Sequence, residues 1–431
     1  MFIYSIAQEK LTLHPAVTWI ALPLLFTAVI FMLSGDVLAK GNSSARAVAL
    51  GSAYTSLATG IDAARFNPAN LGLESHQQNG IELVGVGANV NNNSFTLDDY
   101  NKYTGAYLTD GDKDYILSKI PNEGFKLSMD AEAAAVGLSI GSFAFSSNGA
   151  AIADINMSKD LMNLILNGNT FADTIDITGS YSAGYAYASF GVSYGTLLYS
   201  QGSRQLSVGA TYNYLKGFGY EEVVSLQGMA ATFATGFEGN GEAIIRTASG
   251  GSGYAIDLGS SLQLTKNYTV GAVIKNFVSG ITWTDETEEH GYLFDFDTMT
   301  VDNMGEDYVT SEDYTKEIPS FKSSLPSSLQ IGFAKTAGNF LWAVDWEQGF
   351  SSKTGVSTEP RISAGAEWYA LGFLPIRAGY ATGGKENSSF SFGSGLHFAF
   401  FYLDAAVVTG SSFSGSSSKG ANFALTTGLV F

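Results

Sequence analysis

The stretch RQLSVGATYNY (Arg204–Tyr214) alternates strictly between two kinds of side chain. Leu, Val, Ala and Tyr fall on one face, and Gln, Ser, Gly, Thr and Asn fall on the other. A period of two is typical of a β-strand with one apolar and one polar face. The same alternation runs through residues 328–333, 339–347 and 422–431. We therefore predict an all-β chain.

Two architectures satisfy this pattern. A soluble sandwich or propeller buries the apolar face against a second sheet, whereas a transmembrane barrel turns it toward lipid. Segments of about ten residues, the length that crosses a bilayer at a tilt, favour the barrel. Aromatic residues near segment ends and ionisable residues on the polar face favour it too. We predict an antiparallel transmembrane β-barrel of about 14 strands within residues 80–431, embedded in outer-membrane lipid.

Composition narrows the classes of function. The 431 residues include 40 acidic and 22 basic ones, a formal net charge of −18 that argues against a nucleic-acid partner. The chain has no cysteine, which excludes thiol catalysis and cysteine-rich zinc sites. The string GVSYG (Gly191–Gly195) resembles a nucleophile elbow but falls inside an alternating strand. We expect no catalytic residue, no metal and no cofactor, and so no enzyme.

The N-terminus is typical of an export signal. Residues Ala16–Leu33 form an apolar run, followed by small residues at 37 and 39. We predict that residues 1–39 are a signal peptide, with a retained membrane anchor as the alternative. The chain ends on Phe431, closing an alternating strand as outer-membrane barrels commonly do. This ending predicts recognition by the barrel-assembly machinery and a location in the bacterial outer membrane.

The connections between strands differ in length. The pattern predicts successive strands at 130–147 and 149–157, and a helix capped by Ser158 and ended by Gly168. Residues 285–317 hold twelve acids and one base, which predicts a long acidic extracellular loop. Three aspartates in TDGDKDY (Thr109–Tyr115) have the spacing of a calcium-binding loop. The glycine and glutamate that such a loop needs are not at the matching positions, so we predict a solvated loop instead.

The segment ALGSAYTSLATGIDAARFNPANLGL (Ala49–Leu73) resembles the N-terminal signature of the long-chain fatty-acid transporter superfamily of outer-membrane barrels. That group includes toluene-type hydrocarbon channels and a barrel subunit of the Bacteroidota secretion machinery. Asn67, Pro68 and Ala69 match its Asn-Pro-Ala triplet, and Asp62 matches the upstream acid. Asn70 stands where the transporters usually have Gly, as in the superfamily's uncharacterised relatives.

The resemblance implies that residues 40–79 fold inward as a hatch or plug. Small residues at 45–64 and a proline that holds Asn67 extended are consistent with backbone packed inside a barrel. An ordinary surface turn is the alternative. The predicted hatch motif is Asp62, Asn67, Pro68, Ala69 and Asn70.

The alternation also predicts charged groups on the inward face of the strands. They are Asp257, Lys275, Asp345, Glu347, Arg361, Glu367, Arg377, His397 and Asp404. Glu367 and Arg377 lie on successive strands, where they can pair. Such a network either fixes the hatch to the wall or forms a polar path that moves when the hatch opens.

Two functions follow as hypotheses. The first is passive binding or passage of a hydrophobic small-molecule ligand such as a fatty acid. The second is a scaffold without transport, which docks a secretion or surface-attachment partner through its long loops.

Overall fold

The computed structural model describes residues 43–168, 174–233, 236–299, 309–351, 354–355, 357–384, 388–410 and 417–431. The predicted signal peptide, residues 1–39, lies outside the described residues, as do residues 40–42 of the predicted hatch. In the part of the chain that is described, no helix is both long and apolar enough to cross a membrane.

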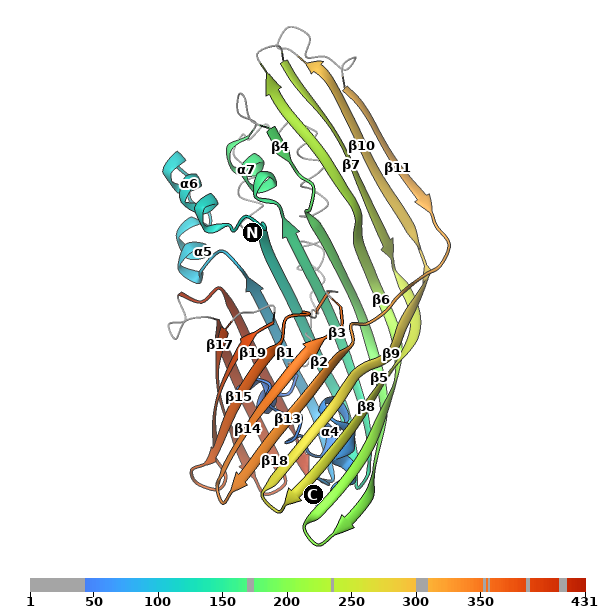
Figure 1. Cartoon of the computed structure of the whole chain (residues 1–431), viewed down its shortest axis with the longest axis vertical. Helices are drawn as coiled ribbons and strands as arrows, with labels where there is room; N and C mark the ends of the chain where they lie inside the picture. The colour runs from blue at the N-terminus through green and yellow to red at the C-terminus, as the bar shows by residue number, and fades with distance from the viewer. Residues whose placement is uncertain are drawn as a thin grey trace.

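Fourteen antiparallel strands close into a barrel, because β1 pairs with both β2 and the last strand, β19 (Figure 1). In ring order they are β1 (Gly80–Asn92), β2 (Phe125–Ile140), β3 (Phe143–Met157), β5 (Tyr181–Gln201), β6 (Arg204–Phe233), β8 (Gly250–Thr265), β9 (Tyr268–Asp285), β13 (Ser328–Ala337), β14 (Phe340–Gly349), β15 (Arg361–Tyr369), β16 (Pro375–Gly383), β17 (Ser388–Phe398), β18 (Phe401–Gly410) and β19. The last strand covers Gly420–Val430. The predicted all-β barrel and its strand number are confirmed.

The two faces of the wall differ as the alternation predicts. In β6, Gln205, Ser207 and Thr211 are buried, whereas Tyr212 and Tyr214 are about half exposed. The same holds in the shorter strands, where large apolar side chains point outward all around the ring. A continuous apolar exterior of this kind is what lipid covers in a membrane barrel.

Short turns lie at one rim of the barrel and longer connections at the other. The expected turn near residue 148 is wrong: β2 and β3 meet at Gly141–Ser142, and β3 runs through residue 148. Gly141 has a φ of +55°, a left-handed conformation that glycine adopts without strain. The alternation is similar on both sides of this turn, so its position was not visible in the pattern.

Beyond the barrel, five antiparallel elements form a second region that we call the outer sheet (Figure 1). It contains the far half of β6 with β4 (Thr174–Asp176), β7 (Gly236–Ala248), β10 (Glu288–Met299) and β11 (Val309–Glu317). A short strand, β12 (Phe321–Ser323), returns the chain to β9. The predicted loop at 285–317 is therefore largely a β-hairpin, because Tyr292 and Phe294 pack into an apolar cluster despite their acidic neighbours.

In the described parts of the long connections there are three helices. The expected helix is confirmed as α7 (Lys159–Asn167), where Ser158 Oγ accepts from the Leu161 N–H and Gly168 follows the last turn. The two others, α5 (Leu97–Tyr103) and α6 (Asp110–Lys119), were not expected. The solvated loop predicted at Thr109–Tyr115 is wrong, because Thr109 and Asp112 form a capping box that begins α6.

Residues 43–79, which we call the inner segment, contact strands on several sides of the barrel near the rim with the short turns (Figure 1). The segment contains α3 (Ala45–Ala49), α4 (Gly60–Phe66) and the 3₁₀ turn η1 (Pro68–Gly72). Helix α3 contacts β16–β19, α4 contacts β1, β2, β3 and β5, and η1 contacts β5, β6 and β8. These strands lie on different sides of the barrel wall. The inner segment, which contacts all of them, therefore runs across the interior of the barrel.

Candidate functional site

The Asn-Pro-Ala-Asn motif sits against three strands with its polar groups bonded. Asn67 Oδ1 accepts from the Ala69 N–H at 3.1 Å, and Asn67 Nδ2 donates to the Ser260 carbonyl at 3.1 Å. Asn70 Nδ2 donates to two carbonyls of the inner segment, and Asn70 Oδ1 accepts from Ser261 Oγ at 2.7 Å. Pro68 opens η1, where its missing N–H costs nothing. The motif thus holds irregular backbone without leaving its amide groups unpaired.

Glycines of the wall lie directly behind the inner segment. A Cβ at Gly209 would lie 2.4 Å from the Pro68 carbonyl carbon, and one at Gly379 would lie 2.3 Å from the Gly51 N. Other inward glycines whose added Cβ would lie under 3.0 Å from an atom of this segment are Gly85, Gly137, Gly195, Gly259, Gly271, Gly332, Gly365 and Gly393. Backbone or side-chain atoms of the inner segment therefore touch the wall at positions where any side chain would intervene.

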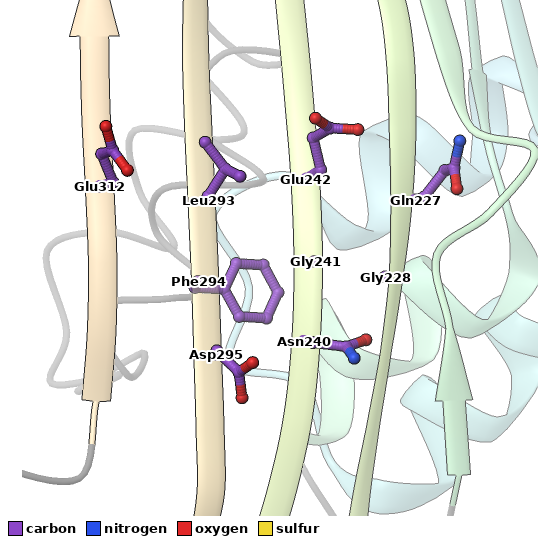
Figure 2. A pocket seen from close by; sticks show the side chains of 9 residues that line it. All are labelled: Gln227, Gly228, Asn240, Gly241, Glu242, Leu293, Phe294, Asp295 and Glu312. Carbon is purple, nitrogen blue, oxygen red and sulfur yellow. The ribbon is translucent and has the colours of Figure 1, made fainter.

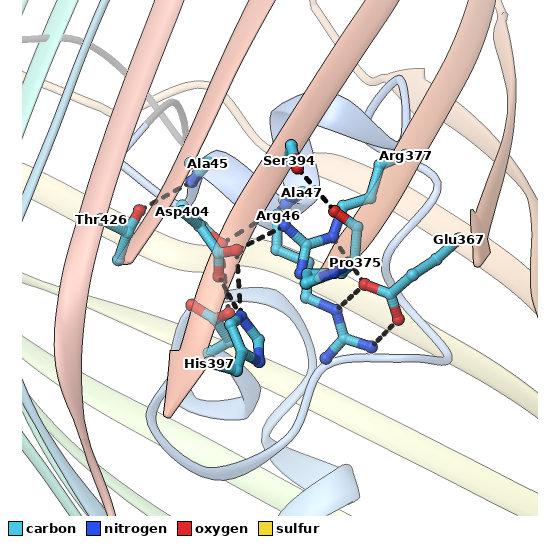
Figure 3. A network of polar contacts seen from close by, with 12 residues as sticks. Ala45, Arg46, Ala47, Glu367, Pro375, Arg377, Ser394, His397, Asp404 and Thr426 are labelled. Atoms are coloured by element: carbon cyan, nitrogen blue, oxygen red, sulfur yellow. Dashed lines mark hydrogen bonds and ion pairs between the residues drawn. The ribbon is translucent and has the colours of Figure 1, made fainter. Parts of the chain in front are cut away.

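A row of alternating charges joins the inner segment to the wall (Figure 3). Arg46 of α3 donates to both oxygens of Glu367, at 2.9 and 2.7 Å. Arg377 lies on the other side of Glu367 at 2.6 Å and also binds Asp404 at 2.6 Å. His397 Nε2 completes the row, 3.1 Å from Asp404 Oδ1. The pair expected between Glu367 and Arg377 is present, in a row that one residue of the inner segment extends.

A second ion cluster surrounds Asp62. Its two oxygens accept from Arg65 at 3.0 Å and from the Tyr54 hydroxyl at 3.0 Å. Arg65 also binds both oxygens of Glu82 on β1, and the Glu82 side chain is almost wholly buried. Asp62 and Arg65 both belong to α4, so Asp62 positions the arginine that joins this helix to β1.

The remaining predicted charges are placed separately from this row. Asp257 binds Lys275 Nζ at 2.6 Å, and Lys275 also donates to the Arg65 carbonyl. Asp345 accepts from the Tyr54 and Thr55 backbone N–H groups at 2.9 and 2.8 Å. Glu347 accepts from Gln330 and lies opposite Arg361 in the strand register. Most of the predicted set thus touches the inner segment or a residue that does.

Three partners were missed by sequence reasoning: Arg46, Arg65 and Glu82. The available signal was that both arginines interrupt a stretch made mostly of small residues. Burial alone would lower the pKa of Arg46, but the Glu367 carboxylate together with Tyr54 and Tyr369 outweighs this effect and raises the pKa well above its usual range. Arg65 behaves likewise beside Glu82 and Asp62, so its raised pKa also keeps it charged. Both arginines are permanent cations at the wall.

Two hydroxyl groups, on β5 and β6, link the wall to the inner segment. Ser193, from the string that resembles a nucleophile elbow, lies inside β5 and shares a hydrogen bond with Thr211 at 2.8 Å. Thr211 in turn donates to the Ala64 carbonyl of the inner segment at 3.0 Å. These hydroxyls support the contact between the inner segment and the wall. At the other end of the chain, Phe431 is exposed beyond β19, and its N–H bonds the Asn79 carbonyl.

Comparison with known proteins places this geometry among barrels. Residues 68–405 match the family of unknown function DUF5723. The TodX deltaS2S3 mutant, a monoaromatic hydrocarbon channel, aligns with a TM-score of 0.53 at 14% identity, over 90% of this chain and 98% of that one. The toluene transporter TbuX of Ralstonia pickettii gives 0.48 at 13% identity over 92% and 98% of the two chains. A FadL homologue of Pseudomonas aeruginosa gives 0.48 at 10% identity over 92% and 99%.

The fold is therefore shared with the TodX mutant, and no curated protein matches the chain. The likeness to secretion-associated Bacteroidota barrels, and the Asn-Pro-Ala triplet as a family signature, stay predictions.

Proposed function

The chain belongs to the family of unknown function DUF5723, and from its structure we propose that it is a bacterial outer-membrane channel for hydrophobic small molecules. The observation that carries this proposal is a closed barrel crossed by a folded inner segment, in a fold shared with the hydrocarbon channel TodX. Its apolar exterior supports a place in the membrane. Monoaromatic hydrocarbons and fatty acids are the ligand classes to test first.

In this proposal the inner segment acts as a hatch. Its contacts with the wall block the direct route through the barrel, so passage requires part of the segment to move. Opening requires the hydrogen bonds and ion pairs at one side of the segment to break. Passage is passive, driven by the concentration gradient, and uses no cofactor.

Uptake by whole cells tests passage. Cells with and without the gene are supplied with labelled toluene, a labelled long-chain fatty acid, and labelled glucose as a polar control. We expect faster uptake of one hydrophobic probe in cells that carry the gene, with glucose unchanged. Equal uptake of both hydrophobic probes in the two strains would overturn the transport function and leave the fold untouched.

A disulfide tests the hatch separately, in a chain that has no native cysteine. A Cβ at Gly137 of β2 would lie 2.5 Å from Ile61 Cγ1 of α4, within reach of a bond that joins Cβ atoms about 3.8 Å apart. We expect the oxidised Ile61→Cys, Gly137→Cys variant to lose uptake and a reductant to restore it. The two single variants are the controls. Full uptake in the oxidised form would show that passage does not need this part of the segment to move.

A further inference from the structure

The outer sheet ends in an open edge. Within the described residues, β11 pairs along its whole length with β10 and with no other strand, as in the register of Leu293 with Glu312. The described side chains of β11, residues 311–317, are nearly all exposed, and Figure 1 shows the strand at the outermost side of the sheet. An edge strand of this kind presents unpaired backbone N–H and C=O groups that an added strand can bond.

A groove lies on the face of the sheet beside that edge (Figure 2). Its volume is about 420 Å³. The lining residues are Gln227, Gly228, Asn240, Gly241, Glu242, Leu293, Phe294, Asp295 and Glu312. Glu312, Leu293, Glu242 and Gln227 form one row across four neighbouring strands. Glu312 therefore belongs to both the edge strand and the groove.

The negative charge of β11 and of the groove indicates which kind of partner can bind there. Strand β11 carries Glu312, Asp313 and Glu317 against the single base Lys316, and the groove adds Glu242 and Asp295. A second copy of the chain docked edge to edge would bring acidic strands together, which is destabilising. A basic strand meets opposite charge instead. Leu293 is 37% exposed, so an apolar side chain of the same partner finds contact on this face.

We propose that the edge of β11 binds an extended, basic polypeptide segment of another protein by strand addition. Backbone hydrogen bonds to β11 supply affinity. Alternate side chains of the added strand point to one face, where Lys or Arg reaches Glu312 and Asp295. The proposal does not depend on passage of small molecules through the barrel, and either function stands if the other fails.

Fluorescence anisotropy with the full chain in detergent micelles tests it. The probe is a labelled ten-residue peptide that alternates Lys with Val or Thr, and its control replaces every Lys by Glu. We expect the basic peptide to bind and the acidic one not to bind, with binding weakened by added salt. Failure of the basic peptide to bind, or equal binding of both, would overturn the proposal.

Two further arms separate strand addition from simple charge attraction. N-methylation of the odd or of the even residues removes one set of backbone donors, and only the set that faces β11 should matter. We expect one methylated peptide to lose binding and the other to keep it. If both bind as well as the parent, no strand is added.

The matched variants compare two acidic regions. Glu242→Gln, Asp295→Asn, Glu312→Gln changes the three acids that line the groove. It should weaken binding about tenfold, since each exposed pair contributes a fraction of a kcal/mol. Asp98→Asn, Asp110→Asn, Asp114→Asn removes the same charge from exposed sites in α5 and α6 and should leave binding unchanged. Equal effects of the two sets would overturn the assignment to β11. If the parent chain dimerises and the first set of substitutions abolishes the dimer, a second copy of the chain is the occupant instead.

Discussion

The inner segment is held by charges at one end and by neutral contacts at the other. Helix α3 is anchored through Arg46 to the buried row of Glu367, Arg377 and Asp404. Turn η1 is anchored through amide and hydroxyl groups. Both ends lie against wall glycines, so the difference between them is the kind of polar anchor. Removing one partner of a buried ion pair costs more free energy than removing one partner of a neutral hydrogen bond, and we therefore expect the charged end to be the more costly to break.

The largest effect is expected at the charged end. Arg377→Leu removes the cation between Glu367 and Asp404. Two buried carboxylates of like charge are then left without the arginine that separates them. Losing one partner of a buried pair costs about 3–5 kcal/mol, so the free energy of unfolding in detergent micelles should fall by that amount. Arg204→Leu, on an exposed arginine at the start of β6, is the control and should change little. A loss below about 1 kcal/mol, the value for surface pairs, would show that the row is not a structural anchor.

A smaller but more local effect is expected at the neutral end. Gly209→Ala places a methyl group 2.4 Å from the Pro68 carbonyl carbon, which η1 can relieve only by moving away from the wall. Overpacking of this kind typically costs about 1–3 kcal/mol of the free energy of unfolding. Gly219→Ala makes the same substitution on the same strand, where nothing lies within 4 Å of the added atom.

The rate and position of proteolytic cleavage show which part of the chain the Gly209→Ala substitution displaces. We expect faster cleavage within residues 43–79 and an unchanged barrel, while Gly219→Ala behaves like the parent. If the two variants are cleaved at the same rate, the close contact at Gly209 does not hold η1 in place.

The sequence predicted what depends on local pattern. Alternation in β6 gave the correct faces, and strand succession brought Glu367 and Arg377 together, since neighbouring inward residues on successive strands meet. It could not reveal Arg46 as the partner of Glu367, because the two are 321 residues apart and belong to different kinds of element. The outer sheet was missed for another reason. Its strands carry many acids, which indicate a solvated loop unless the apolar cluster behind Tyr292 and Phe294 is known.

The smallest of these effects is expected for a single amide in the neutral anchor. Asn70→Ala removes the donors to the Thr55 and Ala58 carbonyls and the acceptor for Ser261. Buried polar groups left without partners cost about 1–3 kcal/mol each, although the small residue leaves space for water to replace some bonds. We expect a loss of about 2 kcal/mol in the free energy of unfolding.

The comparison of Asn70 with an exposed asparagine isolates the buried hydrogen bonds from the change of side chain. Asn101→Ala, on the exposed side of α5, should shift stability by less than about 0.5 kcal/mol, as surface substitutions do. If Asn70→Ala costs no more than Asn101→Ala, the neutral end owes its position to contact with glycine alone. If it costs as much as Arg377→Leu, the two ends of the inner segment are anchored equally and the division between charged and neutral anchors fails.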